Sequence, residues 1–295
     1  MKRILLLVFL FVFTLISESQ KGYPLLTNFY ESRDIENQSW AICQDENHIM
    51  LFANRKGILT FDGQEWKQAK ISVIPYAMQK NPLNGKIYVG GENDYGFVEK
   101  DKQGNYNYTS LSTQSTDIGT ISRIVFKDSV IWFCSDLSVN RFSLSKNKCD
   151  LVIKSKSGYP FTGMITNKSN TFINVVESGL HRLESDTLFP IVTGYLTGNV
   201  EILFSLPYDD KLVLVGQSNG KLSLFDGIKY YDYPIKDEGY LNSNILSDGL
   251  ALADSAYVFS TLDGGAIIVE KKSGKVLLTI NNQVDLPDDE IFAIG

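Results

Sequence analysis

Short apolar runs alternate with polar turns along most of this chain, and the whole pattern repeats. The stretch FANRKGILTFDGQEW (52–66) holds two apolar segments, a polar break that ends in Gly57, and a second turn at Asp62-Gly63. Segments of the same form follow at KIYVGGENDYGFVEKDKQG (86–104), SVIWFCSDLSVNRFSLSKN (129–147), NTFINVVESGLHRLESD (170–186), KLVLVGQSNGKLSLFDG (211–227) and SAYVFSTLDGGAIIVEKKSG (255–274). The hairpin of the first segment therefore belongs to a repeated unit.

Each of these hairpins has a further apolar run before it and another after it, which makes four strands in a unit of about 41 residues. That period is typical of propeller blades. A β-sandwich also has short strands and frequent turns, but it would not repeat a four-strand unit six times in register. The sequence predicts an all-β, seven-bladed-type β-propeller with six four-stranded blades, at about 38–71, 74–111, 119–153, 161–192, 199–235 and 243–280.

The last residues, LPDDEIFAIG, resemble the first strand of a seventh, incomplete blade at 287–295. We expect the chain to be a fragment, or this blade to be completed by other residues. The N-terminal segment 20–37 could donate one outer strand to close the ring.

The middle turn of each unit favours glycine, because a tight hairpin there needs a positive φ. The positions aligned with Gly57 are Gly96, Ser138, Gly179, Gly220 and Gly265. Ser138 breaks the pattern, so a looser turn is expected in the third unit.

The first nineteen residues have the pattern of a secretory signal peptide. Lys2 and Arg3 precede an apolar run from Ile4 to Ile16, and Ser17 and Ser19 are small residues before a cut after Ser19. The run is too short to span a bilayer. The alternative is a buried strand or an uncleaved anchor. We expect an exported, periplasmic protein.

Composition agrees with a folded β-protein that does not bind nucleic acid. Hydrophobic residues make up 43% and charged residues 21%, and aromatic residues are plentiful. Loss of residues 1–19 removes two cations and one anion, which changes the net charge from −6 to −7. An acidic chain without a basic stripe argues against nucleic acid and anionic membrane as partners of this segment. Cys43, Cys134 and Cys149 lie in apolar runs and suggest buried thiols, with a Cys134–Cys149 disulfide as the alternative.

Several segments of the chain resemble a known family. LPDDEIFAIG, the hairpins such as ILTFDG, and the run YPLLTNFYESRDIENQSWAICQDENHIMLFANRKGILTFDGQEW (23–66) are similar to two-component regulator propeller repeats. These occur in the exported sensor regions of Bacteroidetes-type hybrid two-component and triple-tyrosine-motif regulators. The resemblance implies one or two seven-bladed propellers, then a membrane helix and a histidine kinase or helix-turn-helix output. Such a membrane helix and output would lie downstream of the chain considered.

Ligands of propellers usually bind on the face shared by the middle turns and the loops that enter the innermost strands. The residues expected on that face are Gln38, Trp40, Asn54, Arg55, Tyr76, Asn93, Tyr95, Arg123, Glu177, Asn219 and Asp263. Aromatic rings beside amide and charged groups suit a glycan or small molecule, because C–H faces pack on rings while hydroxyls need donors and acceptors. Alternatively, the aromatic residues pack between blades and the polar ones are solvated turn positions.

An enzyme is the less favoured reading. His48 and His181 fit neither a nucleophile elbow nor a zinc spacing. Gly90-Gly91 is followed by acidic residues, so it is unsuited to phosphate. We expect no cofactor and no metal. Two carboxylates of a glycan-active enzyme could still meet across blades.

The sequence thus favours an extracytoplasmic ligand-sensing propeller that signals to downstream domains. The alternatives are a structural scaffold that forms a homodimer, and the glycan-active enzyme.

Overall fold

The computed structural model describes residues 26–29, 38–112, 117–191, 200–233, 235–236, 238–253, 255–284 and 286–295. The predicted signal peptide, 1–19, lies outside these ranges, as does most of the segment 20–37.

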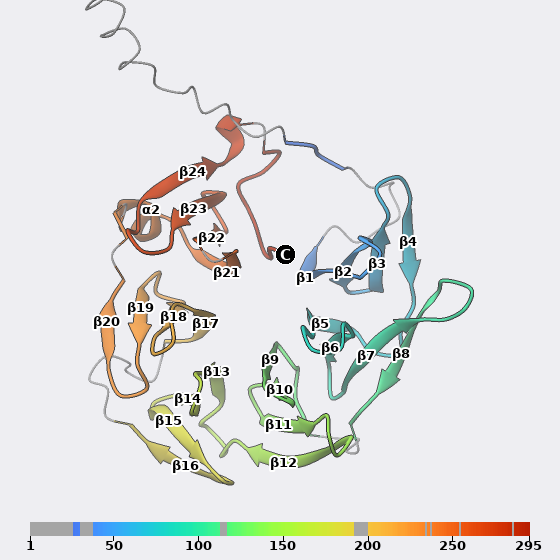
Figure 1. Ribbon diagram of the computed structural model, residues 1–295, viewed down its shortest axis with the longest axis horizontal. Helices are drawn as coiled ribbons and strands as arrows, with labels where there is room; N and C mark the ends of the chain where they lie inside the picture. Colours follow the sequence, from blue (N-terminus) through green and yellow to red (C-terminus); the bar gives the residue numbers. More distant parts are fainter. Residues whose placement is uncertain are drawn as a thin grey trace, which may run out of the picture.

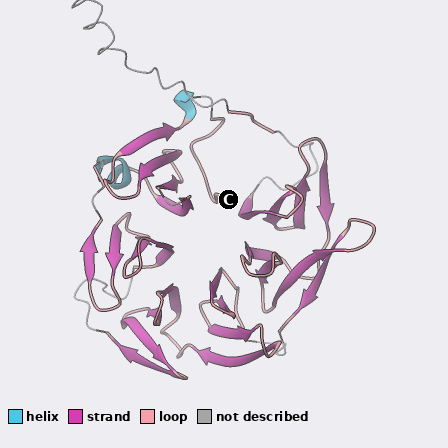
Figure 2. Ribbon diagram, in the orientation of Figure 1, coloured by secondary structure: helices cyan, strands magenta, loops and turns pink. Residues whose placement is uncertain are grey.

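The described residues form a ring of six sheets around a central axis (Figures 1 and 2). Each sheet is a blade of four sequential antiparallel strands, with the first strand innermost. The strands of blades 1 to 3 are β1 (Ser39–Gln44), β2 (Met50–Asn54), β3 (Gly57–Phe61), β4 (Trp66–Ala69); β5 (Pro75–Lys80), β6 (Ile87–Gly91), β7 (Tyr95–Lys100), β8 (Tyr106–Ser110); β9 (Arg123–Lys127), β10 (Val130–Cys134), β11 (Ser138–Ser143), β12 (Lys148–Lys154). Those of blades 4 to 6 are β13 (Phe161–Thr166), β14 (Thr171–Val175), β15 (Gly179–Glu184), β16 (Thr187–Pro190); β17 (Ile202–Pro207), β18 (Val213–Gln217), β19 (Leu222–Phe225), β20 (Tyr230–Asp232); β21 (Leu246–Leu252), β22 (Ala256–Thr261), β23 (Ala266–Glu270), β24 (Val276–Ile280). The prediction of six four-stranded blades is confirmed.

The hydrophobic core is divided into layers between neighbouring blades. Leu51 and Ala53 of blade 1 pack with Met78 and Val89 of blade 2, and the same arrangement joins each of the next four pairs of blades. The second strands are accordingly buried on both sides, as in β6, β14 and β18. This explains why these strands are continuous apolar runs without polar alternation.

Glycines let neighbouring blades approach closely at some of these layers. The ring of Phe204 on β17 lies against Gly216 of its own blade and Gly249 of blade 6. A Cβ atom on either glycine would come within 2.5 Å of that ring. Any larger residue at these two positions would displace the aromatic side chain.

Five innermost strands share an irregularity near their first residues. Their register shifts lie between Ser39 and Ala41, Pro75 and Ala77, Phe161 and Met164, Ile202 and Phe204, and Leu246 and Asp248. A bulge re-aims side chains and adds twist. Here it removes Trp40 and Tyr76 from regular pairing.

The middle turns agree only in part with the glycine pattern. Gly57, Gly179, Gly220 and Gly265 have positive φ, as expected. Gly96, in contrast, lies within β7 opposite Val89, so its alignment with the other turn glycines was wrong.

The turn of the third blade was also wrongly expected to be loose. It is tight, because the backbone N–H of Ser135 donates to the carbonyl of Ser138 over 2.8 Å. The Ser135 hydroxyl in turn accepts from the backbone N–H groups of Leu137 and Ser138.

The helices of the described part are short. α2 (Glu238–Ser243) contributes Leu241 to the core between blades 5 and 6, and Tyr240 donates to the carbonyl of Gly264 over 2.8 Å. The 3₁₀ helix η1 (Asn282–Val284) follows β24. Among the described residues, no helix has the length and apolar character needed to cross a membrane.

The cysteines are free thiols. Burial raises the pKa of Cys43 to about 11 and that of Cys134 to about 12. Cys134 on β10 and Cys149 on β12 are separated by β11, hence by about 10 Å across the sheet, which is beyond the reach of a disulfide. The alternative of a Cys134–Cys149 bond is therefore not realised.

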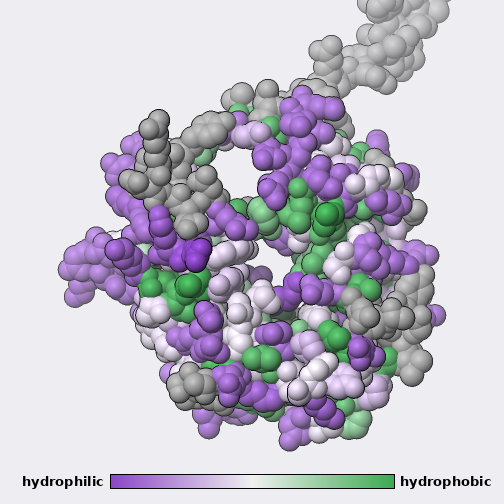
Figure 3. Space-filling view, turned by 180° about the vertical axis from the view of Figure 1, so that it is seen from behind, coloured by the Kyte–Doolittle hydropathy of each residue, from purple (hydrophilic) through white to green (hydrophobic). Residues whose placement is uncertain are grey.

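Residues 286–295 run from the rim of the ring to its centre between blades 6 and 1 (Figure 1). The backbone N–H of Ile291 donates to the carbonyl of Thr261 over 3.0 Å, and the Ser247 hydroxyl donates to the carbonyl of Ile291 over 2.6 Å. The segment carries no assigned strand. Figure 3 shows an opening at the centre of the ring and a second one nearer the rim.

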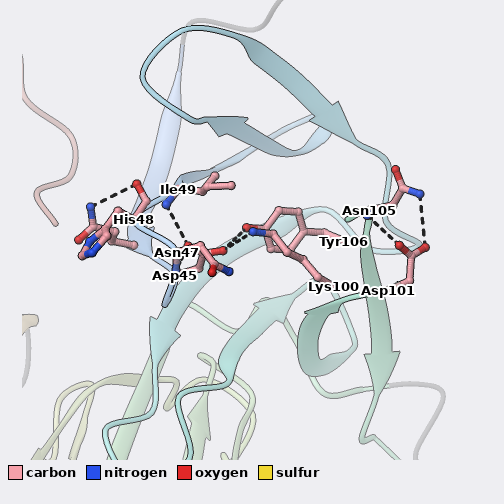
Figure 4. Close-up of polar contacts among 9 residues, drawn as sticks. Asp45, Asn47, His48, Ile49, Lys100, Asp101, Asn105 and Tyr106 are labelled. Atoms are coloured by element: carbon pink, nitrogen blue, oxygen red, sulfur yellow. Dashed lines mark hydrogen bonds and ion pairs between the residues drawn. The ribbon is translucent and has the colours of Figure 1, made fainter. Parts of the chain in front are cut away.

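A buried carboxylate joins blade 1 to blade 2 (Figure 4). Asp45, only 8% exposed, accepts hydrogen bonds from Lys100 Nζ and Tyr106 Oη, both 2.6 Å from its Oδ2. Its Oδ1 accepts from the backbone N–H groups of Asn47 and Ile49. Burial opposes ionisation, but these donors outweigh it and lower the pKa of Asp45 from 3.8 to about 2.

We predict that Asp45→Asn lowers the free energy of unfolding at pH 7 by about 2 kcal/mol, because it leaves the partly buried Lys100 without its counter-charge. The carboxyl pKa is lower in the folded chain than in the unfolded one. Its stabilisation is therefore complete above about pH 4 and is lost as the pH falls towards 2. Urea denaturation at pH 7 and pH 3 measures both effects.

The matched control is Glu99→Gln, which removes an exposed carboxylate paired with Lys86. It should cost less than about 1 kcal/mol at either pH. Equal losses for the two variants would contradict the role given to Asp45.

Candidate functional site

Two aromatic side chains stack where the first two innermost strands begin. Trp40 on β1 and Tyr76 on β5 are half-buried, with ring centroids 4.6 Å apart and ring planes inclined by 25°. The bulges of β1 and β5 remove these two residues from regular pairing with β2 and β6. They lie at the end of the channel next to the middle turns, and we call this end the channel mouth.

Charged residues of opposite sign lie at the same end. Arg123 begins β9, and Asp248 lies on β21, three blades away around the ring. Each group acts electrostatically on the other across the channel. The guanidinium of Arg123 makes no hydrogen bond to any residue that the structure describes, which leaves its donors free for a ligand.

The environment shifts the titration of both groups. Burial lowers the pKa of Arg123, while the charges of Asp248 and Glu201 act in the opposite sense. Burial raises the pKa of Asp248, although the backbone N–H groups of Gly249 and Ile294 and the charge of Arg123 oppose it. The mouth thus holds a cation beside a carboxyl group that ionises less readily than usual.

Six of the remaining candidates are exposed around this face: Gln38, Arg55, Asn93, Glu177, Asn219 and Asp263. The side chains of three of them accept hydrogen bonds from backbone N–H groups. Asn93 Oδ1 accepts from the backbone N–H of Gly119, Asn219 Oδ1 from that of Lys221, and Asp263 Oδ1 from that of Ile245.

Two candidates are in the interior. Tyr95 is 2% exposed and stacks on Phe133 of blade 3 with centroids 4.2 Å apart. Asn54 is fully buried at the end of β2, and its Oδ1 accepts from the backbone N–H of Lys56. Neither side chain is accessible to a ligand in this structure. Tyr95 was taken for a turn residue because the turn between β6 and β7 ends one residue earlier than the sequence suggested.

Asp248 and Glu201 were not among the sequence candidates. A signal was present, since they are the acidic residues in the predicted innermost strands ILSDGLAL and EILFSL. A charge within a run that is otherwise apolar or uncharged indicates a polar environment such as a channel.

Histidine and metal chemistry find little support in the described part of the chain. His181 is buried, and its ring nitrogens contact the Ser178 hydroxyl and the carbonyl of Gly179. No group of three or more His, Cys, Asp or Glu side chains within the described ranges could hold a metal ion.

Comparison with known proteins identifies the fold. No protein-family model matches the sequence, and no curated protein matches it either. Among solved structures, the chain is similar to the WD40 beta propeller domain of Doa1, with a TM-score of 0.65 and 12% identity over 88% of this chain and 86% of that one.

Two further similar structures are the extracellular domains of the putative hybrid two component systems BT3049 and BT4673 from B. thetaiotaomicron. Their TM-scores are 0.64 and 0.63, with 14% and 12% identity over 88% and 87% of this chain. The match spans only 37% of each of those two chains. At such identities the likeness establishes the propeller fold alone.

We predict a large loss of stability at one candidate position and almost none at another. Tyr95→Ala should lower the free energy of unfolding by about 3–5 kcal/mol, because it empties a core position. Arg55→Ala, on an exposed turn, should change it by less than about 0.5 kcal/mol. Urea denaturation at neutral pH measures both, and a Tyr95→Ala chain as stable as the parent would return Tyr95 to the list of site residues.

Proposed function

We propose that the chain is the extracytoplasmic ligand-sensing propeller of a bacterial two-component or transcriptional regulator. It binds a small hydroxylated ligand, of the glycan class, at the channel mouth and passes the bound state to downstream domains. The observation that carries this proposal is the stacked pair Trp40–Tyr76 at the same end of the channel as the guanidinium of Arg123, which makes no hydrogen bond to a described residue. An aromatic platform beside charged donors suits the C–H face and the hydroxyls of a sugar.

The fold shared with the extracellular domains of two hybrid two component systems supports the sensor class. The signal-peptide pattern of residues 1–19 supports export to the periplasm. The ring is proposed to be of the seven-bladed type, with residues 287–295 as the innermost strand of the seventh blade. Their place between blades 6 and 1 and their hydrogen bonds to blade 6 support this.

Signalling is proposed to proceed through a change in how the ring docks on a neighbouring domain. Five apolar layers join the six blades in sequence, so the blades have little freedom to move singly. No enzymatic activity is proposed for this chain.

The ligand is tested by calorimetric titration of the purified chain with a glycan panel. We expect at least one glycan to bind. Trp40→Ala and Arg123→Gln should each lower the affinity for that glycan at least tenfold. Lys86→Gln, in the turn between β5 and β6 at the other end of blade 2, is the control and should bind as the parent does. Absence of heat with every glycan, together with tight self-association in sedimentation, would favour a structural dimerisation scaffold.

Export is tested by the mass of the chain recovered from the periplasm of an expressing bacterium. The expected species begins at Gln20. Leu7→Arg, which places a charge in the apolar region, should leave an uncleaved precursor in the cytoplasm, whereas Leu7→Ile should be processed normally. A parent chain that keeps residues 1–19 and stays in the cytoplasm would refute export.

A further inference from the structure

A cavity of about 230 Å³ lies between blades 3 and 4. The turn between β9 and β10 contributes Lys127 and Asp128, and the turn between β13 and β14 contributes Ser169 and Asn170. These turns join the ends of strands that are remote from the middle turns. The cavity therefore opens on the face of the ring opposite the channel mouth.

The cavity is rich in hydrogen-bond donors that have no partner. Lys127 makes no ion pair or hydrogen bond with any residue that the structure describes. Arg141 donates through Nε to Asp150 Oδ1 over 2.7 Å, and its two terminal nitrogens make no hydrogen bond within the described ranges. The indole nitrogen of Trp132, a residue that is 4% exposed, is buried without a partner. The ammonium group of Lys127 and the terminal nitrogens of Arg141 are half-buried donors that an anionic ligand could engage. The Trp132 nitrogen has almost no accessible surface and lies behind the cavity wall.

The charge balance of the cavity is positive in a chain that is acidic overall. Asp150 is shared between Arg141 and Lys146, whose Nζ lies 3.0 Å from Oδ2. Both Asp150 and Lys146 lie outside the lining, in which Asp128 is the carboxylate and is exposed. The lining thus holds two cations, Lys127 and Arg141, and one carboxylate. Burial lowers the pKa of Lys127, which indicates that water does not fully solvate its ammonium group.

The walls add apolar surface to these donors. Val130 and Leu183 line the cavity from opposite blades, and the guanidinium of Arg141 lies 5.9 Å from the ring of Trp132. Hydroxyl and amide groups come from Ser169, Asn170 and Ser185. A compact ligand with an apolar face, several hydroxyls and one negative charge matches this combination.

We propose that this cavity between blades 3 and 4 is a second binding site, which takes a carboxylate-bearing ligand of monosaccharide size. Its carboxylate accepts from Lys127 and Arg141, and its hydroxyls bind the serine and asparagine side chains. The site is independent of the channel mouth, because it lies on the other face and shares no residue with it.

Nuclear magnetic resonance of the ¹⁵N-labelled chain tests the site through its tryptophans. The chain has three Trp residues and hence three indole N–H signals, of which Trp132→Phe assigns the one in the cavity. Titration with sodium D-galacturonate should shift the Trp132 signal until it saturates, with the Trp40 and Trp66 signals unmoved. D-galactose, which lacks the carboxylate, should bind at least tenfold more weakly.

Lys127→Gln and Arg141→Gln should each weaken the binding of galacturonate at least fivefold. Lys127 has no partner to lose, so its variant stays informative if the loss of the Arg141–Asp150 pair disturbs the blade. Arg182→Gln is the matched control, because Arg182 alternates with Leu183 along β15 and faces away from the cavity. It should bind as the parent does.

The proposal is overturned if the Trp132 signal does not move with galacturonate, or if sodium acetate at equal ionic strength shifts it as much. Equal affinity for galactose, or unchanged affinity in Lys127→Gln, would also overturn it. A shift of the Trp40 signal alone would support the channel mouth as a site and refute the cavity, so the two proposals fail separately.

Discussion

The packing of one small sheet against the next is the interaction on which this molecule depends. A four-stranded sheet of this length buries too little apolar surface to be stable by itself. Its middle strands carry apolar side chains on both faces, and in β6, β14 and β18 every residue is buried. Both faces must therefore be covered. A neighbouring blade provides the cover in five layers, and residues 286–295 lie in the space between blades 6 and 1. This mutual cover produces a ring, in which the core is a series of layers rather than a single centre.

The same constraint shapes the places where ligands could bind. The inner strands surround the central channel, and bulges at their first residues turn Trp40 and Tyr76 out of the regular ladder. Arg123 and Asp248, far apart in the sequence, come under each other's influence there. Between blades 3 and 4, the apolar layer gives way at one end to Lys127 and a donor-rich cavity. Rigid packing holds residues from different blades at fixed positions, which is what a selective site requires.

Periodicity predicted the architecture well, because strand length, turn spacing and apolar runs are local properties of the chain. The strands of the first two blades lie within the predicted ranges 38–71 and 74–111. Side-chain roles were less predictable. The pattern did not reveal that the hydroxyl of Ser135 would close a turn without glycine. The burial of Tyr95 depends on Phe133 of the next blade, and the cavity at Trp132 depends on two blades meeting, so neither could be read from one segment.

Hydrogen exchange measured by mass spectrometry is the most direct test of mutual cover between blades. If blades stabilise one another, the second strands of all six should be the slowest to exchange, with similar protection, and should open together near the global unfolding transition. The outer strands β4, β8, β16 and β20 should exchange faster, since they carry fewer buried residues. A second strand that exchanged early and alone, while its neighbours stayed protected, would contradict the account.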